Sequence, residues 1–157
     1  MNDAQPHEAV ARPRTAAGLL LLDEEDRVLL VEPTYKPGRD LPGGYLHAGE
    51  SPSDAAAREV REELGIGPPI GRLLVADWAP HPAEGDKLLF VFDGGILPAG
   101  ERDRVVADGT EIGGYAFHPA DRLDALLAPR LARRVRAALL ARERSTTLYL
   151  EHGVPRP

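Results

Sequence analysis

The sequence predicts a single α/β domain, and three observations predict it. The chain of 157 residues has the length of one domain, strand-like and helix-like segments alternate along it, and one helix carries signals at both of its ends. A chain of this length can bury a substantial hydrophobic core. Interleaved strands and helices are typical of layered α/β architectures. We therefore expect a flexible N-terminal tail over residues 1–13, a domain over 14–144 and a C-terminal tail over 145–157.

The expected strands are apolar segments bounded by turn residues. They lie at residues 14–22, 27–32, 70–78, 87–93 and 111–117. Residues 94–108 are charged in their middle, and we expect them to form a mobile loop. Two helices, at 121–127 and 129–144, follow the last strand.

The remaining helix, at residues 52–64, has a clear beginning and a clear end. Ser51 is a favourable N-cap, Pro52 suits the first helical position, and Asp54 has the spacing of a capping box. Gly65 suits the left-handed conformation that commonly follows a helix. We expect one face of this helix, with Val60 among its residues, to pack on the rest of the domain.

Three carboxylates, Glu59, Glu62 and Glu63, lie near the end of this helix. At about 100° per residue they fall within an arc of roughly 100°. Like charges at these spacings repel by about 0.2–0.5 kcal/mol per pair, and the helix C-terminus disfavours anions. A divalent cation would stabilise the cluster, because Mg²⁺ prefers oxygen ligands. A solvated acidic face is the alternative interpretation.

The residues around the cluster support the metal-site interpretation. Leu41-Pro42-Gly43-Gly44 leads into the segment GYLHAGESPSDAAAREVREELGI. Its defined positions are Gly44, Glu50, Arg58-Glu59-Val60, Glu62-Glu63 and Gly65-Ile66. This pattern resembles the signature of the Nudix hydrolases at every specified position. Because it defines many positions over a fixed spacing, it is far more specific than a lone glycine motif.

The resemblance implies a Nudix fold, an α/β/α sandwich around a mixed β-sheet with a catalytic loop–helix–loop. It implies a metal-dependent pyrophosphohydrolase that cleaves a nucleoside diphosphate linked to another group. ADP-ribose, a nucleotide sugar and a nucleoside triphosphate are the candidate substrates. The cofactor is expected to be Mg²⁺, with Mn²⁺ as the alternative, and a homodimer is one possible assembly.

We expect Glu59 and Glu63, four residues apart, to bind the metal directly, because Mg²⁺ typically takes one or two carboxylates together with substrate phosphates. Glu62 is either a third ligand or acts through water. The resemblance implies a further ligand, the backbone carbonyl of Gly43. It also implies that Arg58 pairs with Glu50 to hold the loop against the helix.

Two glutamates are candidates for the general base. Glu111, just before the last expected strand, resembles the downstream glutamate that serves as base in some family members, and Glu62 competes with it. Lys36, Arg39 and Lys87 are candidates for phosphate contacts, with plain surface charges as the alternative.

Composition excludes several other classes of protein. The chain has no cysteine, which excludes disulfides, thiol catalysis and zinc–thiolate sites and argues against an isopentenyl diphosphate type of isomerase. A net charge of −6 argues against a nucleic-acid binder. No apolar signal segment starts the chain and no apolar run is long enough to span a membrane, so we expect a cytoplasmic protein. A non-catalytic Nudix module that binds a nucleotide and regulates a partner remains the alternative function, although such modules usually have degenerate signatures.

Overall fold

A computed structural model describes residues 10–157, so most of the expected N-terminal tail lies outside the described residues. The strands are β1 (Arg14–Leu22), β2 (Val28–Pro33), β3 (Gly43–Tyr45), β4 (Leu73–Trp78), β5 (Lys87–Ile96), β6 (Ile112–His118), β7 (Leu148–Glu151) and β8 (Val154–Pro155). The α-helices are α1 (Pro52–Leu64), α2 (Ala99–Arg102), α3 (Leu123–Leu126) and α4 (Pro129–Glu143). A 3₁₀ turn at Ala120–Arg122 precedes α3.

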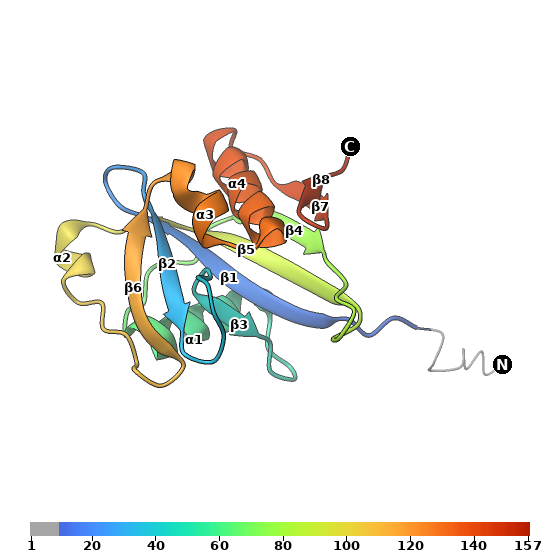
Figure 1. Ribbon diagram of the computed structural model, residues 1–157, viewed down its shortest axis with the longest axis horizontal. Helices are drawn as coiled ribbons and strands as arrows, with labels where there is room; N and C mark the ends of the chain where they lie inside the picture. Colours follow the sequence, from blue (N-terminus) through green and yellow to red (C-terminus); the bar gives the residue numbers. More distant parts are fainter. Residues whose placement is uncertain (1–9) are drawn as a thin grey trace.

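The strands form one mixed sheet in the order β6-β2-β1-β5-β4-β7-β8, and β3 pairs with β1 off this path (Figure 1). β1 is parallel to β5 and antiparallel to β3, and β4 is parallel to β7. The two long helices cover opposite faces of the sheet. This arrangement confirms the α/β class and the mixed sheet between helices that the sequence predicts.

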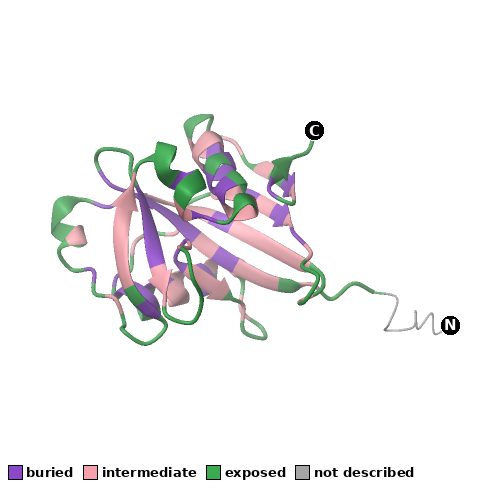
Figure 2. Ribbon diagram, viewed as in Figure 1, coloured by how far each residue is buried: buried purple, intermediate pink, exposed green. Residues whose placement is uncertain are grey.

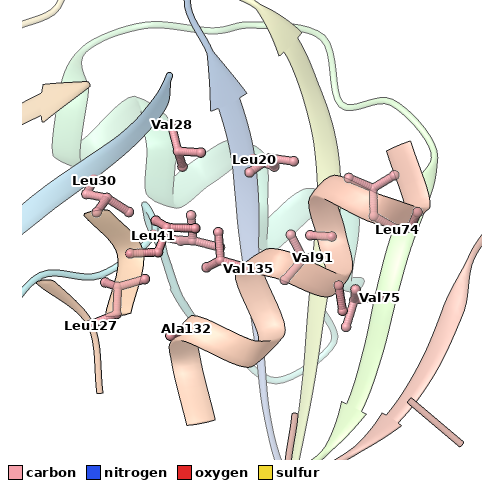
Figure 3. Close-up of a cluster of buried hydrophobic side chains, with 14 of the residues drawn as sticks. Leu20, Val28, Leu30, Leu41, Leu74, Val75, Val91, Leu127, Ala132 and Val135 are labelled. Atoms are coloured by element: carbon pink, nitrogen blue, oxygen red, sulfur yellow. The ribbon is translucent and has the colours of Figure 1, made fainter. Parts of the chain in front are cut away.

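The alternation of side chains along β1 explains why both faces are covered. Successive residues of a strand point to opposite faces, and Leu19 to Leu22 are all almost completely buried. Leu20 packs in the cluster beneath α4, which includes Val135 of that helix (Figure 3). Leu19 packs in the cluster beneath α1, which includes Val60. Figure 2 shows the resulting pattern, with buried residues concentrated on the central strands and exposed ones on the loops.

The C-terminal residues 145–157 are not a tail outside the domain. β7 pairs in parallel with β4, and Leu150 is completely buried in the cluster beneath α4. β8 then returns antiparallel to β7. The sheet therefore needs these residues, and the domain extends beyond the predicted boundary at residue 144.

Three other expectations need correction. The first strand after α1 begins at Leu73 rather than at residue 70. Residues 94–108 are ordered by the end of β5, by α2 and by the buried side chains of Leu97 and Val105. The strand β3 lies in a segment that the sequence analysis treated as a loop.

A buried ion pair links the C-terminal hairpin to the rest of the domain. Asp77 of β4 is completely buried, and its Oδ2 accepts a hydrogen bond from Arg134 Nε of α4 at 2.7 Å. Its Oδ1 accepts from the N–H of Gly153, in the turn between β7 and β8, at 3.0 Å. One carboxylate thus joins three elements on the α4 face of the sheet.

Among residues 10–157, no helix is both long and apolar enough to cross a membrane.

Candidate active site

The helix α1 is positioned by its caps and by its small residues. Ser51 Oγ accepts from the N–H of Asp54 at 3.2 Å, and Gly65 adopts the left-handed conformation with φ of 70° at the other end. Ala55 and Ala56 are completely buried against the sheet, so the helix approaches closely on this side. Ala56 and Val60, both completely buried, lie close to Glu63 around the helix axis, so Glu63 points to the inward face, whereas Glu62 lies at the edge of that face.

Two of the three clustered glutamates line one cavity of about 410 Å³. Glu59 and Glu63 form its α1 wall, and Gly43 and Gly44 of β3 lie beside them. Glu111 lines the same cavity, although it is almost fifty residues away in the sequence. These three glutamates, from two segments, therefore line one cavity, together with Asp40 of the loop before β3.

Glu63 is the deepest of these carboxylates. It is only 3% exposed, and its Oε1 accepts from the N–H of Gly43 at 3.2 Å. Burial raises the pKa of the Glu63 carboxyl well above its ordinary range, and the neighbouring Glu59 carboxylate raises it further. The hydrogen bond from Gly43 offsets only part of this effect.

The glycines of β3 bring its backbone close to these groups. A Cβ on Gly44 would lie 2.5 Å from Glu59 Oε1, and a Cβ on Gly43 would lie 2.3 Å from the carbonyl oxygen of Ala17. Real Cβ atoms do not approach other atoms so closely, so a side chain at position 43 would clash with the backbone of β1, and one at position 44 would displace the Glu59 carboxylate. The Gly-Gly pair therefore sets the distance between the β3 backbone and α1.

Arg58 organises the outer side of the cluster. Its Nε and Nη2 donate to both oxygens of Glu50 at 2.7 and 3.0 Å, and Nη2 also donates to the Tyr45 carbonyl at 3.0 Å. Its Nη1 contacts Glu59 at 2.9 Å and Glu62 at 3.2 Å. The pair predicted between Arg58 and Glu50 is present. Its hydrogen bonds to Arg58, together with one from the N–H of His47, lower the pKa of the Glu50 carboxyl to about 2.

Glu62 does not join Glu59 and Glu63. Its side chain is 55% exposed, and it does not line the cavity. Within residues 10–157, no three Asp, Glu or His side chains converge closely enough to hold a metal ion. Helix α1 thus turns Glu59 and Glu63, the two expected direct ligands, toward β3, and leaves Glu62 at the surface.

Glu111 is held by the turn that precedes it. Asp108 Oδ1 accepts from the N–H groups of Thr110 and Ile112 at 3.0 and 2.9 Å. The Glu111 carbonyl accepts from the N–H of Thr34 at 2.9 Å. These bonds fix the backbone on both sides of Glu111 while its side chain remains exposed at the cavity.

A second cavity of about 470 Å³ lies on the other side of β3, between the sheet and the beginning of α4. Its floor is small or aliphatic, with Ala16, Gly18, Leu89 and Val91 on the sheet and Leu131 on α4. The residues that line both cavities are Tyr35, Asp40, Gly43, Gly44 and Tyr45. The two spaces are therefore neighbours.

The three predicted phosphate-contact residues have different positions. Lys36 and Lys87 line the larger cavity, but each is paired with a carboxylate, Lys36 with Asp40 at 3.0 Å and Lys87 with Glu84 at 2.7 Å. Arg39 lines neither cavity. It pairs instead with Glu32 of β2 at 3.3 Å, away from the carboxylates of α1.

Three further residues, Tyr35, Asp40 and Tyr45, line both cavities and were not predicted from the sequence. Tyr35 lies in the loop between β2 and β3 and is 70% exposed. An exposed aromatic residue in a Pro- and Gly-containing loop beside the glycine pair is the signal that would have identified it. Asp40 and Tyr45 flank the Leu41–Gly44 segment and carry no such signal.

The inward carboxylates have the chemistry of a divalent-cation site. A buried carboxylate beside a second carboxylate, with one backbone N–H donor, needs a cation or a proton to be stable. Hard cations such as Mg²⁺ take carboxylate and backbone carbonyl oxygens and keep several waters. Glu59 and Glu63 fit this requirement, and Glu62 as oriented does not contribute to it.

A family model and a curated relative match most of this chain. A model of the NUDIX domain matches residues 12–140. A protein of Bacillus subtilis (strain 168), provisionally named an 8-oxo-dGTP diphosphatase, is 31% identical over 119 residues, which cover 76% of this chain and 75% of that protein. Diphosphoinositol polyphosphate phosphohydrolase 2 of Rattus norvegicus is 42% identical over 64 residues, 40% of this chain and 36% of that protein.

The solved structures confirm the fold. The NUDIX domain of Shewanella oneidensis NrtR, complexed with ADP ribose, superposes with a TM-score of 0.68 at 19% identity and covers 93% of this chain and 100% of that one. The family model covers most of the chain and includes the loop, the helix α1 and both cavities. The chain belongs to the Nudix hydrolase family.

Proposed function

We propose that this protein is a metal-dependent pyrophosphohydrolase that cleaves a nucleoside diphosphate linked to a further group. The observation that carries the proposal is the convergence of Glu59, Glu63 and Glu111 on one cavity beside a second, larger cavity. The first space has the carboxylates that diphosphate chemistry requires. The second has room for the group attached to the diphosphate.

Glu59 and Glu63 would hold Mg²⁺, or Mn²⁺ as the alternative, with a carbonyl of the glycine pair at Gly43 as a further ligand. A bound divalent cation supplies charge neutralisation at the phosphoryl oxygens and a Lewis acid at the reacting phosphorus. Such a charge is needed here, because a protein with a net charge of −6 would otherwise repel a polyanionic substrate.

Glu111 is the proposed general base. It faces the same cavity as the inward carboxylates, whereas Glu62 is turned outward to Arg58. Glu111 would accept a proton from the attacking water. The water oxygen bonds to phosphorus as the bridging P–O bond breaks. If Glu62 were the base instead, its side chain would have to leave the ion pair with Arg58.

Arg58 and Glu50 are proposed to position the carboxylates rather than to react. The guanidinium fixes Glu59 from outside the cavity at 2.9 Å while its other nitrogens hold Glu50 and the Tyr45 carbonyl. Bidentate arginine–carboxylate pairs are directional. Loss of Arg58 would therefore leave Glu59 free to rotate.

The names of the relatives and of a structural neighbour indicate several kinds of diphosphate-containing compound. One relative is named for 8-oxo-dGTP, another for diphosphoinositol polyphosphates, and a structural neighbour contains ADP ribose. The candidates for this chain are ADP-ribose, a nucleotide sugar and a canonical or oxidised nucleoside triphosphate.

A substrate panel tests the proposal. The purified protein is incubated with Mg²⁺ and with ADP-ribose, nucleotide sugars, dinucleoside polyphosphates and nucleoside triphosphates, and release of phosphate or nucleoside monophosphate is followed. We expect turnover of one class that EDTA abolishes. Folded protein that binds nucleotide but turns over no member of the panel would contradict the proposal and favour a non-catalytic module that regulates a partner.

Two matched variants test the general base. Glu111→Gln is expected to lower kcat by about 10²–10⁴-fold, the usual contribution of general base catalysis. Glu62→Gln is expected to leave kcat within a few-fold. The reverse order of effects would assign the base to Glu62.

A further inference from the structure

A substrate that occupies both cavities must cross β3 at one place. The five residues that line both spaces are the ridge between them, and its centre is the side-chain-free pair Gly43 and Gly44. Tyr35, on the loop between β2 and β3, and Tyr45, at the end of β3, are the two aromatic residues of the ridge. This inference rests on the proposed function, in which the diphosphate lies on the α1 side of the ridge.

The two tyrosines differ in how far their rings are already engaged. The Tyr45 ring has Arg14 Cζ at 4.9 Å and Lys87 Nζ at 5.4 Å from its centroid. Its hydroxyl donates to Glu84 at 2.9 Å. Tyr45 is therefore tied into a cluster of charges at the edge of the larger cavity.

Tyr35 has a far more open ring. It is 70% exposed, and Lys36 Nζ lies 5.8 Å from the centroid of its ring. The loop that carries it is nevertheless anchored, because Thr34 Oγ1 donates to the Thr110 carbonyl at 2.6 Å and Lys36 pairs with Asp40 at 3.0 Å. An anchored loop thus presents a large aromatic surface to solvent at the crossing point.

The charges of the larger cavity indicate what kind of group it takes. Lys36, Lys87 and Arg134 all line it, and each is neutralised by a carboxylate at 2.7–3.0 Å. Arg130 also lines it and is the exception: its Nη2 donates to the Pro80 carbonyl at 2.9 Å and contacts His152 Nδ1 at 3.1 Å, but its buried Nε has no hydrogen-bond partner among the described residues. A highly phosphorylated ring needs several cations that are not already engaged, and Arg130 alone does not supply them.

The floor of the same cavity suits a flat, uncharged ring instead. Ala16 and Gly18 of β1 keep the sheet surface low, and Leu89 and Leu131 supply aliphatic walls. Planar heterocycles gain stability by stacking on aromatic side chains. The nucleobase of a nucleotide has this shape, whereas an inositol polyphosphate has neither a planar ring nor a low charge.

We propose that Tyr35 is a specificity-determining residue, whose ring packs on the base of a nucleoside diphosphate-linked substrate as the substrate crosses Gly43 and Gly44 into the larger cavity. Tyr35 thereby selects nucleotides over diphosphates that lack a planar group.

The test compares two non-hydrolysable ligands that differ only in the nucleoside. α,β-Methylene-ADP carries a base, and methylenediphosphonate does not; both are titrated in the presence of Mg²⁺. Tyr35→Ala is expected to weaken the binding of α,β-methylene-ADP by about tenfold, the range of base stacking on an aromatic side chain, and to leave methylenediphosphonate within twofold. Tyr35→Phe should bind both as the wild type does.

A matched control is available on the far edge of the sheet. Tyr149 of β7 is 49% exposed and lines neither cavity, so Tyr149→Ala should change neither titration. For the substrate identified by the panel, Tyr35→Ala should raise KM about tenfold and leave kcat within threefold.

Three results would overturn the assignment: unchanged binding of α,β-methylene-ADP by Tyr35→Ala, an equal loss for both ligands, or wild-type protein that does not bind α,β-methylene-ADP. The proposed function fails separately. Wild-type protein that binds α,β-methylene-ADP through Tyr35 but hydrolyses no substrate would contradict catalysis and leave the role of Tyr35 intact.

Discussion

The buried pair between Asp77 and Arg134 makes a sharp prediction about stability. Asp77 is completely buried and Arg134 Nε lies 2.7 Å from its Oδ2, while the other oxygen holds the turn at Gly153. Asp77→Ala would leave the Arg134 cation without its counter-charge in a site where its side chain is only 11% exposed. The same change would leave the N–H of Gly153 without an acceptor.

The magnitude follows from the burial of both groups. Removing one partner of a buried ion pair costs about 3–5 kcal/mol. Unfolding entropy of about 2.1 cal/mol/K per residue gives about 0.33 kcal/mol/K for the 157 residues. The melting temperature of Asp77→Ala should therefore fall by about 9–15 °C.

Thermal unfolding followed by circular dichroism measures this shift. The control is Asp124→Ala, which removes the partner of Arg136, another α4 arginine, from a pair at 2.8 Å whose side chains are 77% and 42% exposed. A surface pair contributes about 0–1 kcal/mol, so this control should shift the melting temperature by no more than about 3 °C. Adding Arg134→Met to Asp77→Ala should recover part of the loss, because it removes the unpaired cation. Equal shifts for Asp77→Ala and Asp124→Ala would refute the reasoning.

Three further predictions concern the site and the hairpin. Gly44→Ala must displace the Glu59 carboxylate, since the new Cβ would lie 2.5 Å from Oε1. We expect turnover to fall by about 10²-fold with the melting temperature nearly unchanged. Gly67→Ala is the control, because its new Cβ meets no atom within 4 Å. Because Arg58 lowers the pKa of folded Glu50 from 4.5 to about 2, this pair should stabilise the fold above pH 4.5 and lose its effect as the pH falls toward 2. Urea unfolding of Glu50→Gln should show a flatter pH dependence over that window, and parallel curves for variant and wild type would contradict it. Leu150→Ala should cost about 2–5 kcal/mol in the same unfolding assay, and a loss below 1 kcal/mol would show that β7 contributes little.

The sequence predicted those features that depend on neighbouring residues. Helix α1 begins after Ser51 and ends before Gly65 as expected, because capping and the left-handed terminus are local effects. The pair between Arg58 and Glu50 was implied by the resemblance to the Nudix signature. The positions of most strands along the sequence were predictable because apolar runs between turn residues identify them.

Features that depend on long-range packing were not predictable. Which of the clustered glutamates turns inward depends on the contact of Ala55 and Ala56 with the sheet, and spacing alone placed Glu62 with the others. β7 is a four-residue strand whose place is set by parallel pairing with β4, about seventy residues earlier. The position of Tyr35 at the ridge depends on the path of the loop between β2 and β3. Loops lack the repeating hydrophobic pattern from which helices and strands are predicted.

Glu59 and Glu63 are proposed to form the metal site of a hydrolase. The most direct test measures Mn²⁺ binding by electron paramagnetic resonance, and Mg²⁺-dependent turnover, for Glu63→Gln beside wild type and Glu62→Gln. We predict that Glu63→Gln keeps its fold by circular dichroism but loses at least about tenfold in Mn²⁺ affinity and about 10²-fold or more in turnover, while Glu62→Gln stays close to wild type. Unchanged Mn²⁺ binding and turnover in Glu63→Gln would contradict the account.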